Sequence, residues 1–371
     1  MMEYNEALQC HFRPQRGWMN DPNGLVFYRG YYHLFFQYSP NHETPGLEPV
    51  VWGHARTKDF LHWEHLPLAL TPGQPADKDG CWSGTAVVRG DRLYLFYASV
   101  INDPAIQFVD QSVSVAWSDD GVHFTKYENN PVIPRYPADG CFDFRDPAVL
   151  RDGDTFYLVM GSGNEAAREA RLLLYQSDDL LHWTYKGVMC SWPKARCCEC
   201  PSFVRYGEEY LLSTSVMYLD GTLGFSVMVG SFDGSTFTPR VTGQPQKGPD
   251  QYAGQIFRDD KGRALLIAWI PGWDEGFRHL AERCIGCQSV PIELHVRDGK
   301  VCGMPAAEVR HLLRESDPAV LVTEHGFTVP RQNRPDVEYH GEVRDIRILR
   351  DNYVLEIFLN GGEEIYSVIL C

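Results

Sequence analysis

Short runs of apolar, β-branched and aromatic residues, separated by Gly, Asp and Asn, dominate the hydrophobic pattern of the chain. Such runs are typical of strands bounded by turns. They occur at Leu25–Tyr28, Tyr31–Gln37, Ala86–Val88, Leu93–Ala98, Thr155–Met160 and Leu172–Gln176. Apolar residues spaced at the helical period are scarce. The pattern therefore predicts an all-β protein.

A second pattern repeats along the chain: a turn rich in Ser, Thr and Asp, followed by an aromatic residue that opens a strand. The aromatic members are Trp63, Phe124, Trp183 and Phe237, which lie 61, 59 and 54 residues apart. A constant period with four short strands per unit is typical of a β-propeller blade. With one more unit around Gln255–Val296, we expect five blades. A coincidental turn motif in another all-β fold is the alternative, and four occurrences at a near-constant step argue against it.

The repeat ends near residue 310, which predicts a propeller domain at 1–310 and a small C-terminal β domain at 311–371. We expect a short helical connection at Arg310–Ser316 and a hairpin turn at Asn360-Gly361-Gly362. The strand candidates are Ala319–Val322, Val337–Leu349, Tyr353–Leu359 and Glu364–Leu370. About 60 residues make only a shortened β-sheet, a truncated β-sandwich, which cannot cover both of its faces. It should therefore pack on the propeller or on a second copy, and we expect a homodimer.

Charge narrows the range of partners. The chain of 371 residues has 34 Lys and Arg against 49 Asp and Glu, a net charge of −15. A negative field repels phosphate backbones and anionic lipids, so we expect neither a nucleic acid nor a membrane partner. The chain has no apolar run of about 18 residues and no apolar stretch at its N-terminus, so we expect no transmembrane helix and no secretory signal. The 11 cysteines then indicate reduced thiols in a cytoplasmic protein.

Two Cys-x-x-Cys pairs, Cys197/Cys200 and Cys284/Cys287, raise the question of a zinc site. The pairs are 84 positions apart, whereas the halves of such sites usually lie about 15–20 residues apart. Buried free cysteine packs as a small hydrophobe. We therefore expect structural thiols and no metal.

Four polar clusters lie early in successive units of the repeat. They are centred on Asp21, Ser83, Asp146 and Glu199, which precede the next repeat aromatic by 42, 41, 37 and 38 residues. The first strand of each blade lines the central channel, so three carboxylates from three blades should converge in one funnel. A proline follows each carboxylate within two residues, and proline marks strand ends or bulges, where a side chain can be aimed into a cavity. A single Asp-Pro pair is most simply a turn, and the shared register is what favours a site.

Three converging carboxylates suit the cleavage of a glycosidic bond. One attacks or stabilises the anomeric carbon, and a second, kept protonated, gives its proton to the leaving oxygen. Glu199 suits the proton donor, because its cysteine neighbours and the nearby acids favour the protonated form. Amide donors from the asparagines flanking Asp21 would hold that carboxylate ionised, and Arg145 would do the same for Asp146.

At these residues the sequence resembles glycoside hydrolase family 32, the β-fructofuranosidases, which include invertases, levanases, inulinases and sucrose-6-phosphate hydrolases. Six ordered motifs between about residues 8 and 310 carry the resemblance: Trp18–Gly24, Phe35–Pro40, Trp52–Ala55, Gly80–Gly84, Phe144–Pro147 and Glu199–Pro201. Two positions depart from the family pattern. Leu47 stands where the family often has Trp, and Pro291-Ile292-Glu293-Leu294 replaces Pro-Arg-Glu-Leu.

The resemblance implies a five-bladed propeller with a C-terminal β-sandwich, and a retaining, metal-free hydrolysis of β-fructofuranosides that uses no cofactor. It makes Asp21 the nucleophile, Glu199 the acid/base and Asp146 the stabiliser of the transition state. Arg145 would orient the carboxylates. Substrate contacts are expected from Asn20, Gln37, Trp52, Trp82 and Ser83.

The expected substrates are sucrose, sucrose 6-phosphate or short fructo-oligosaccharides, because a cytoplasmic enzyme needs an imported sugar. One alternative is an inverting five-bladed glycosidase that removes arabinose or xylose branches, which the anomer of the first product distinguishes. The other is a non-catalytic sugar-binding propeller, whose mark would be the loss of a carboxylate. All three carboxylates are present in this chain.

Overall fold

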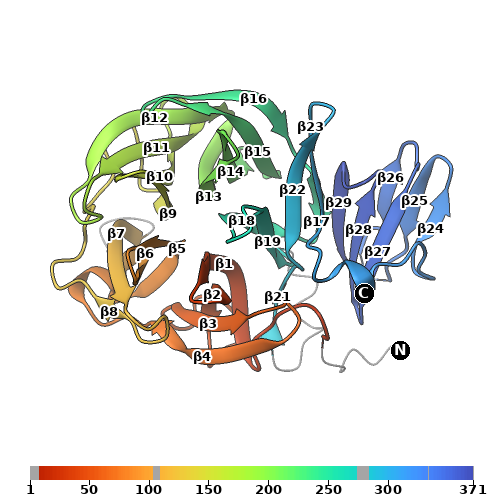
Figure 1. The fold of residues 1–371 in the computed structure, drawn as a ribbon, viewed down its shortest axis with the longest axis horizontal. Coiled ribbons are helices and arrows are strands. Elements are labelled where there is room, and N and C mark those ends of the chain that lie inside the picture. Colours follow the sequence, from red (N-terminus) through yellow and green to blue (C-terminus); the bar gives the residue numbers. More distant parts are fainter. Residues whose placement is uncertain (1–7, 103–108, 274–283, 333, 371) are drawn as a thin grey trace.

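Five antiparallel sheets are arranged around a central axis as the blades of a propeller (Figure 1). This computed structural model describes residues 8–102, 109–273, 284–332 and 334–370. The five blades that the repeat predicted are confirmed. In each blade the chain runs outward, so that the first strand lies nearest the axis and the fourth lies at the rim.

Blade I consists of β1 (Gly17–Tyr28), β2 (Tyr31–Ser39), β3 (Val51–Thr57) and β4 (Trp63–Leu70), with β20 (Cys284–Ile285) parallel to β1. Blade II consists of β5 (Gly80–Arg89), β6 (Arg92–Asn102), β7 (Val109–Ser118) and β8 (Thr125–Lys126). Blade III consists of β9 (Phe144–Asp152), β10 (Thr155–Asn164), β11 (Glu169–Ser177) and β12 (Thr184–Pro193). Blade IV consists of β13 (Ala195–Tyr206), β14 (Glu209–Tyr218), β15 (Leu223–Phe232) and β16 (Phe237–Gly243). Blade V consists of β18 (Tyr252–Arg258), β19 (Ala264–Ile270), β22 (Ile292–Arg297) and β23 (Lys300–Pro305), with β21 (Cys287–Gln288) beside β19.

The repeated turn joins the third and fourth strands of a blade. In blade III, Asp179 Oδ1 accepts hydrogen bonds from the backbone N–H of Leu181 and His182 at 2.9 and 2.8 Å. The His182 ring contacts the other carboxylate oxygen over 2.6 Å. The same contacts recur at Asp59 in blade I and Asp120 in blade II. The repeat in the sequence is therefore a hydrogen-bonded turn that sets the start of the outer strand in blades I, II and III.

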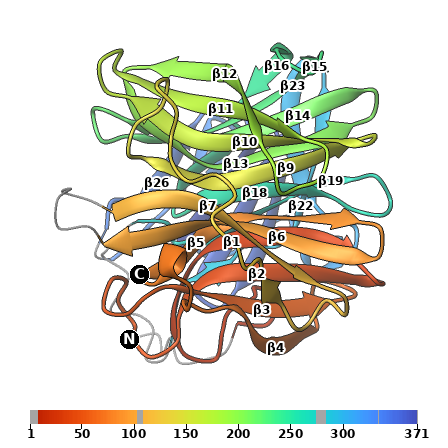
Figure 2. The same ribbon diagram turned by 90° about the vertical axis from the view of Figure 1, so that its left-hand side faces the viewer.

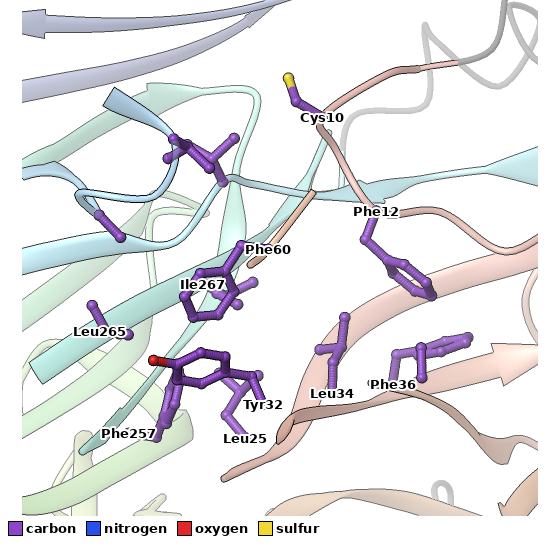
Figure 3. Packing of buried hydrophobic residues seen from close by; sticks show 14 of the residues in the cluster. Cys10, Phe12, Leu25, Tyr32, Leu34, Phe36, Phe60, Phe257, Leu265 and Ile267 are labelled. Carbon is purple, nitrogen blue, oxygen red and sulfur yellow. The ribbon is translucent and has the colours of Figure 1, made fainter. Parts of the chain in front are cut away.

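Aromatic packing joins the last blade to the first and closes the ring. Phe60, on the repeated turn of blade I, lies 4.1 Å from the ring of Tyr32 and belongs to a buried cluster with Phe257 and Ile267 of blade V. Figure 3 shows these side chains pointing toward one another, with Leu265 beside them. Such a contact buries large apolar surfaces of both blades. It holds together the two ends of the propeller sequence.

The C-terminal part contains two sheets that cover each other. One has the order β17-β29-β28-β27 and the other β24-β25-β26. Their bounds are β17 (Gln246–Pro249), β24 (Leu321–Thr323), β25 (Gly326–Val329), β26 (Val337–His340), β27 (Ile346–Asp351), β28 (Val354–Leu359) and β29 (Glu364–Ile369). One apolar cluster with Phe327, Val337, Ile357 and Val368 fills the space between them. The expected single strand Val337–Leu349 is wrong, because the chain turns at 341–345 to pass from one sheet to the other. The expected connection is confirmed as a short 3₁₀ helix at Arg310–Leu312.

The larger of these sheets is attached to the propeller. β17 lies in the segment that connects blade IV to blade V, and it pairs in parallel with β29. Phe358 and Ile365 pack into a cluster with Leu294 of blade V, and Figure 2 shows this part of the chain behind the propeller. We expected a homodimer because an apolar face of the C-terminal sheet would be uncovered. That argument no longer holds, because the propeller covers one face of the larger sheet and the second sheet covers the other. The dimer stays a prediction that light scattering at micromolar concentration can check.

Among the described residues, no helix has the length and apolarity that crossing a membrane requires.

Candidate active site

The innermost strand of every blade is irregular at the same end. In β1, β5, β9, β13 and β18, one extra residue bulges out against the neighbouring strand, beside positions 20–21, 82–83, 146–147, 200–201 and 253–254. Asp146, Cys200 and Ala253 have left-handed backbones there, with φ of +60°, +46° and +54°. A bulge re-aims the side chains beside it. The prolines that follow the carboxylates mark these bulges, as the sequence predicted.

The bulges surround a cavity of about 530 Å³ that holds Asp21, Asp146 and Glu199 together. Its lining consists of Asn20, Asp21, Gln37, Pro45–Val50, Asp79, Trp82, Asn102, Arg145, Asp146, Arg196, Glu199, Met217 and Trp273. A second cavity of about 370 Å³ lies farther along the same inner strands, and its described lining contains no carboxylate. The convergence of three acids from blades I, III and IV, predicted from register alone, is thus what the fold produces.

Asp21 is held by three donors. Ser83 Oγ donates to Oδ2 at 2.6 Å, Asn20 Nδ2 donates to Oδ1 at 3.0 Å, and the Cys200 thiol lies 3.3 Å from Oδ2. Burial nevertheless raises the pKa of Asp21, and the charge of Glu199 adds to this effect. Asn20 thus donates to Asp21 as expected, and desolvation outweighs the donors in the direction of the shift.

Asn23 is one of the donors that the sequence assigned to Asp21, and it turns elsewhere. With its amide oriented so that both ends are satisfied, Asn23 donates to Ser83 Oγ at 3.3 Å and accepts from the Gln37 N–H at 3.2 Å. Asn23 therefore supports the residue that bonds Asp21 instead of the carboxylate itself.

Glu199 is clamped from two sides. Arg145 donates to Oε1 through both Nε and Nη2, at 3.0 and 2.9 Å, so two charge-assisted bonds converge on one carboxylate oxygen. The hydroxyl of Tyr252 donates to Oε2 at 2.5 Å. Sequence reasoning missed Tyr252. The signal was present, because Tyr252 directly precedes the bulge of the fifth inner strand, as Glu199 precedes that of the fourth.

Asp146 is the least compensated of the three acids. Burial raises its pKa to about 7, with Glu199 and Asp21 adding to the effect of burial while Arg145 opposes it. The expectation that Arg145 keeps Asp146 ionised is wrong, because the guanidinium is bonded to Glu199 and, through Nη1 at 2.6 Å, to Asp143. The carboxylate of Asp146 keeps a bond from the Cys200 N–H at 2.9 Å.

Comparison with known proteins identifies the family of this site. The model described as "Glycosyl hydrolases family 32 N-terminal domain" matches residues 11–305. The chain belongs to glycosyl hydrolase family 32. It is 34% identical over 345 residues to a sucrose-6-phosphate hydrolase of Zymomonas mobilis, covering 86% of this chain and 66% of that protein. It is also 34% identical over 341 residues to a raffinose invertase of Escherichia coli, covering 87% of this chain and 69% of that one.

Among solved structures, the Bombyx mori GH32 β-fructofuranosidase superposes with a TM-score of 0.85 at 26% identity, covering 98% of this chain and 89% of that one. The fold of family 32, a five-bladed propeller followed by a β-sandwich, is thus present throughout the described residues. The chain spans about two thirds of the length of the curated relatives that it matches.

Family 32 substrate contacts that the motifs predicted fall into two groups. Asn20, Gln37, Trp82 and Arg145 line the cavity. Ser83 and Trp52 are buried behind it: Gln37 Nε2 donates to Ser83 Oγ at 2.5 Å, and Trp52 Nε1 donates to the carbonyl of Trp82 at 3.0 Å. Trp52 and Ser83 thus lie outside the described lining of the cavity, and their contacts with substrate stay predictions.

The described cysteines do not gather around a common point in this family 32 site. Cys197 contacts Arg145 at 3.6 Å and Met217 at 3.5 Å, whereas Cys200 faces Asp21. The nine cysteines whose side chains are described are free thiols. The side chain of Cys284 lies outside the described residues.

A buried cluster away from the cavity lining combines metal-donor atoms of three residues, Cys10, His11 and Asp351. Asp351 Oδ2 receives the Cys10 thiol at 3.2 Å and contacts His11 Nδ1 at 2.9 Å. Cys10 and His11 thus both bond to one oxygen of Asp351, and these bonds join the N-terminal segment to β27.

Proposed function

We propose that this chain hydrolyses terminal β-D-fructofuranosides with retention of configuration. The observation that carries the proposal is the meeting of Asp21, Asp146 and Glu199 in one cavity of about 530 Å³, each from a different blade. Two carboxyl groups flanking one bond are the machinery of glycoside hydrolysis. Membership of family 32 and the sucrose complex of a variant of the Bombyx mori enzyme support fructosides as the substrate class.

The first step divides the work between Asp21 and Glu199. An oxygen of Asp21 attacks the anomeric carbon of the fructosyl unit, the bond to the leaving oxygen breaks, and Glu199 gives that oxygen a proton. In the second step Glu199 takes a proton from water, the water oxygen attacks the same carbon, and Asp21 is released. Arg145 and Tyr252 keep Glu199 in one orientation through both steps.

Asp146 would bind the fructosyl hydroxyls, whose hydrogen bonds strengthen as positive charge develops on the ring. The base of the cavity is buried, while its outer residues Leu47 and Trp273 are 64% and 45% exposed. A sugar must therefore enter with one end first, which suits removal of a terminal unit from a small fructoside.

The test is a sugar-release panel of sucrose, sucrose 6-phosphate, kestose, inulin and levan, with NMR of the first-formed anomer. β-Fructofuranose as first product supports the proposal. Inverted arabinose or xylose from branched glycans would establish the debranching alternative, and binding of fructose oligomers without release of hexose would establish a non-catalytic propeller. Expression with a compartment marker checks the predicted cytoplasmic location.

Variants test the assignment of roles. Asp21→Asn and Glu199→Gln should each lower kcat about 10³-fold or more, since proton transfer alone contributes about 10²–10⁴-fold. Glu208→Gln is the matched control, because Glu208 is exposed at the turn where the strand carrying Glu199 ends. Circular dichroism checks that each variant is folded, and wild-type turnover by either site variant refutes the assignment.

A further inference from the structure

The outer half of the cavity, where the leaving group of a fructoside must lie, carries an excess of negative charge. The described lining contains the carboxylates of Glu48 and Asp79, which are both partly exposed, in addition to Asp21, Asp146 and Glu199. Its guanidinium groups are those of Arg145, at the base, and Arg196, in the outer half.

Both guanidinium groups are already engaged by carboxylates. Arg196 donates to Asp143 through Nε at 3.0 Å and Nη2 at 3.3 Å, and Asp143 is buried between Arg196 and Arg145. Arg145 donates to Asp143 through Nη1 at 2.6 Å and to Glu199 through Nε and Nη2. These two cations are thus matched by two anions, and the described lining contains no further Arg or Lys beside Glu48 and Asp79.

Glu48 and Asp79 each accept hydrogen bonds from neighbouring donors. The two carboxylate oxygens of Glu48 each accept a hydrogen bond of 2.9 Å from Asn41. Asp79 accepts from the Asn102 N–H at 2.7 Å and pairs with Lys78 at 2.5 Å. Lys78 is half-exposed and does not belong to the described cavity lining.

We propose that the leaving-group half of this site selects an uncharged sugar and rejects a phosphorylated one, with Glu48 and Asp79 as the specificity-determining residues. A phosphate ester carries about −1.5 to −2 charges at pH 7 and needs uncommitted Arg or Lys donors. Each carboxylate beside it adds repulsion. This inference rests on the proposed function, and it selects sucrose over sucrose 6-phosphate, whose phosphate is on the leaving glucose.

The first test compares kcat/KM of the wild-type enzyme for the two sugars at 20 and 300 mM salt. We expect at least tenfold preference for sucrose at low salt. The preference should narrow at high salt, because the screening length falls from about 20 Å to about 6 Å. Efficiency on the phosphorylated sugar equal to or above that on sucrose overturns the inference. If neither sugar releases fructose, the proposed function fails instead.

The second test removes the two rim charges by Glu48→Gln with Asp79→Asn. The preference for sucrose should fall at least threefold through a lower KM for the phosphorylated sugar. Asp154→Asn, on the exposed turn after β9, changes the net charge at the far end of a strand about 20 Å long or more and should leave the ratio unaltered. An unaltered ratio in the folded double variant removes Glu48 and Asp79 from the account, and the wild-type salt dependence decides the inference if that variant does not fold.

Discussion

Arg145 directs its guanidinium group to Glu199 and Asp143 and not to its sequence neighbour Asp146. The carboxyl group of Asp146 is therefore buried close to other acids. The sequence could predict that Asp146 reaches the cavity, because that depends on the register of the repeat. It could not predict the charge of Asp146, because the partner that captures Arg145 lies 54 residues farther along the chain. Trp52 is a second case in which the sequence could not predict the contact. Its motif indicates the site, but packing decides that the indole of Trp82 lines the cavity while that of Trp52 is buried.

Asp146→Asn should stabilise the protein, most of all at alkaline pH. The pKa of Asp146 is about 7 in the fold against an ordinary value of 3.8, so the fold loses stability as pH rises from about 4 to 7 and the loss is complete above that range. Asn carries no charge at any pH. The gain in free energy of unfolding should be about 2–3 kcal/mol larger at pH 8 than at pH 5. Urea titrations at both pH values check this, and an equal gain at both would contradict it.

Tyr252→Phe should lower kcat about tenfold while KM changes less than twofold, because a charge-assisted hydrogen bond contributes about 1.5–3 kcal/mol. Tyr252 acts as a positioning residue: its hydroxyl holds Glu199 and leaves the fructosyl contacts untouched. Tyr210→Phe is the control, since Tyr210 bonds Asp152 at 2.6 Å outside the cavity lining. Equal losses in both variants would indicate a general effect on folding.

At the scale of elements, the sequence predicted those turns whose residues are close together along the chain. The repeated turns and the hairpin at Asn360-Gly361-Gly362 follow from residues within a few positions of one another, and all three hairpin residues have positive φ in the fold. β17 gave no such signal, because Gln246–Pro249 is a polar segment with Gly and Pro whose strand character comes from pairing with β29. β25, which has four residues, was missed as well.

His11 joins two elements that are far apart in sequence, the segment before β1 and the strand pair β27–β28. Its Nδ1 lies 2.9 Å from Asp351, and its Nε2 lies 3.8 Å from Glu356, with all three side chains buried. Burial opposes the charge of His11, but its contacts with Asp351, Cys10 and Glu356 raise its pKa well above the ordinary value. The imidazolium therefore stabilises the fold fully below about pH 6.5, and this contribution is lost as pH rises through the higher folded pKa.

His11→Phe should lower the free energy of unfolding by about 3–5 kcal/mol at pH 6, because it leaves two buried carboxylates without their cation. Urea denaturation gives the value. Adding Glu356→Gln should restore part of the loss, since it removes one of the unpaired charges. A double variant no more stable than His11→Phe alone would show that packing, and not charge, is what His11 provides.

At the scale of the whole molecule, the C-terminal sheets pack against the propeller through shared apolar clusters. Tyr353, Val354 and Ile369 pack against Trp18 and Trp269 beside the site. A chain ending at residue 312 should therefore expose this apolar surface and β17, and it should be aggregated or inactive. Size-exclusion chromatography and a fructose-release assay check this, and a monodisperse, active fragment would contradict it.

The parallel pairing of β17 with β29 has a consequence for how the polypeptide comes apart. The backbone passes between the propeller and the C-terminal sheets three times: after β16, before β18 and after β23. The two parts are therefore connected at three places along the chain. Nicking by a protease between residues 313 and 320 cuts one crossing and leaves the interlocked strands intact. The two polypeptides should co-elute until a denaturant parts them, and they should separate only when the propeller itself unfolds.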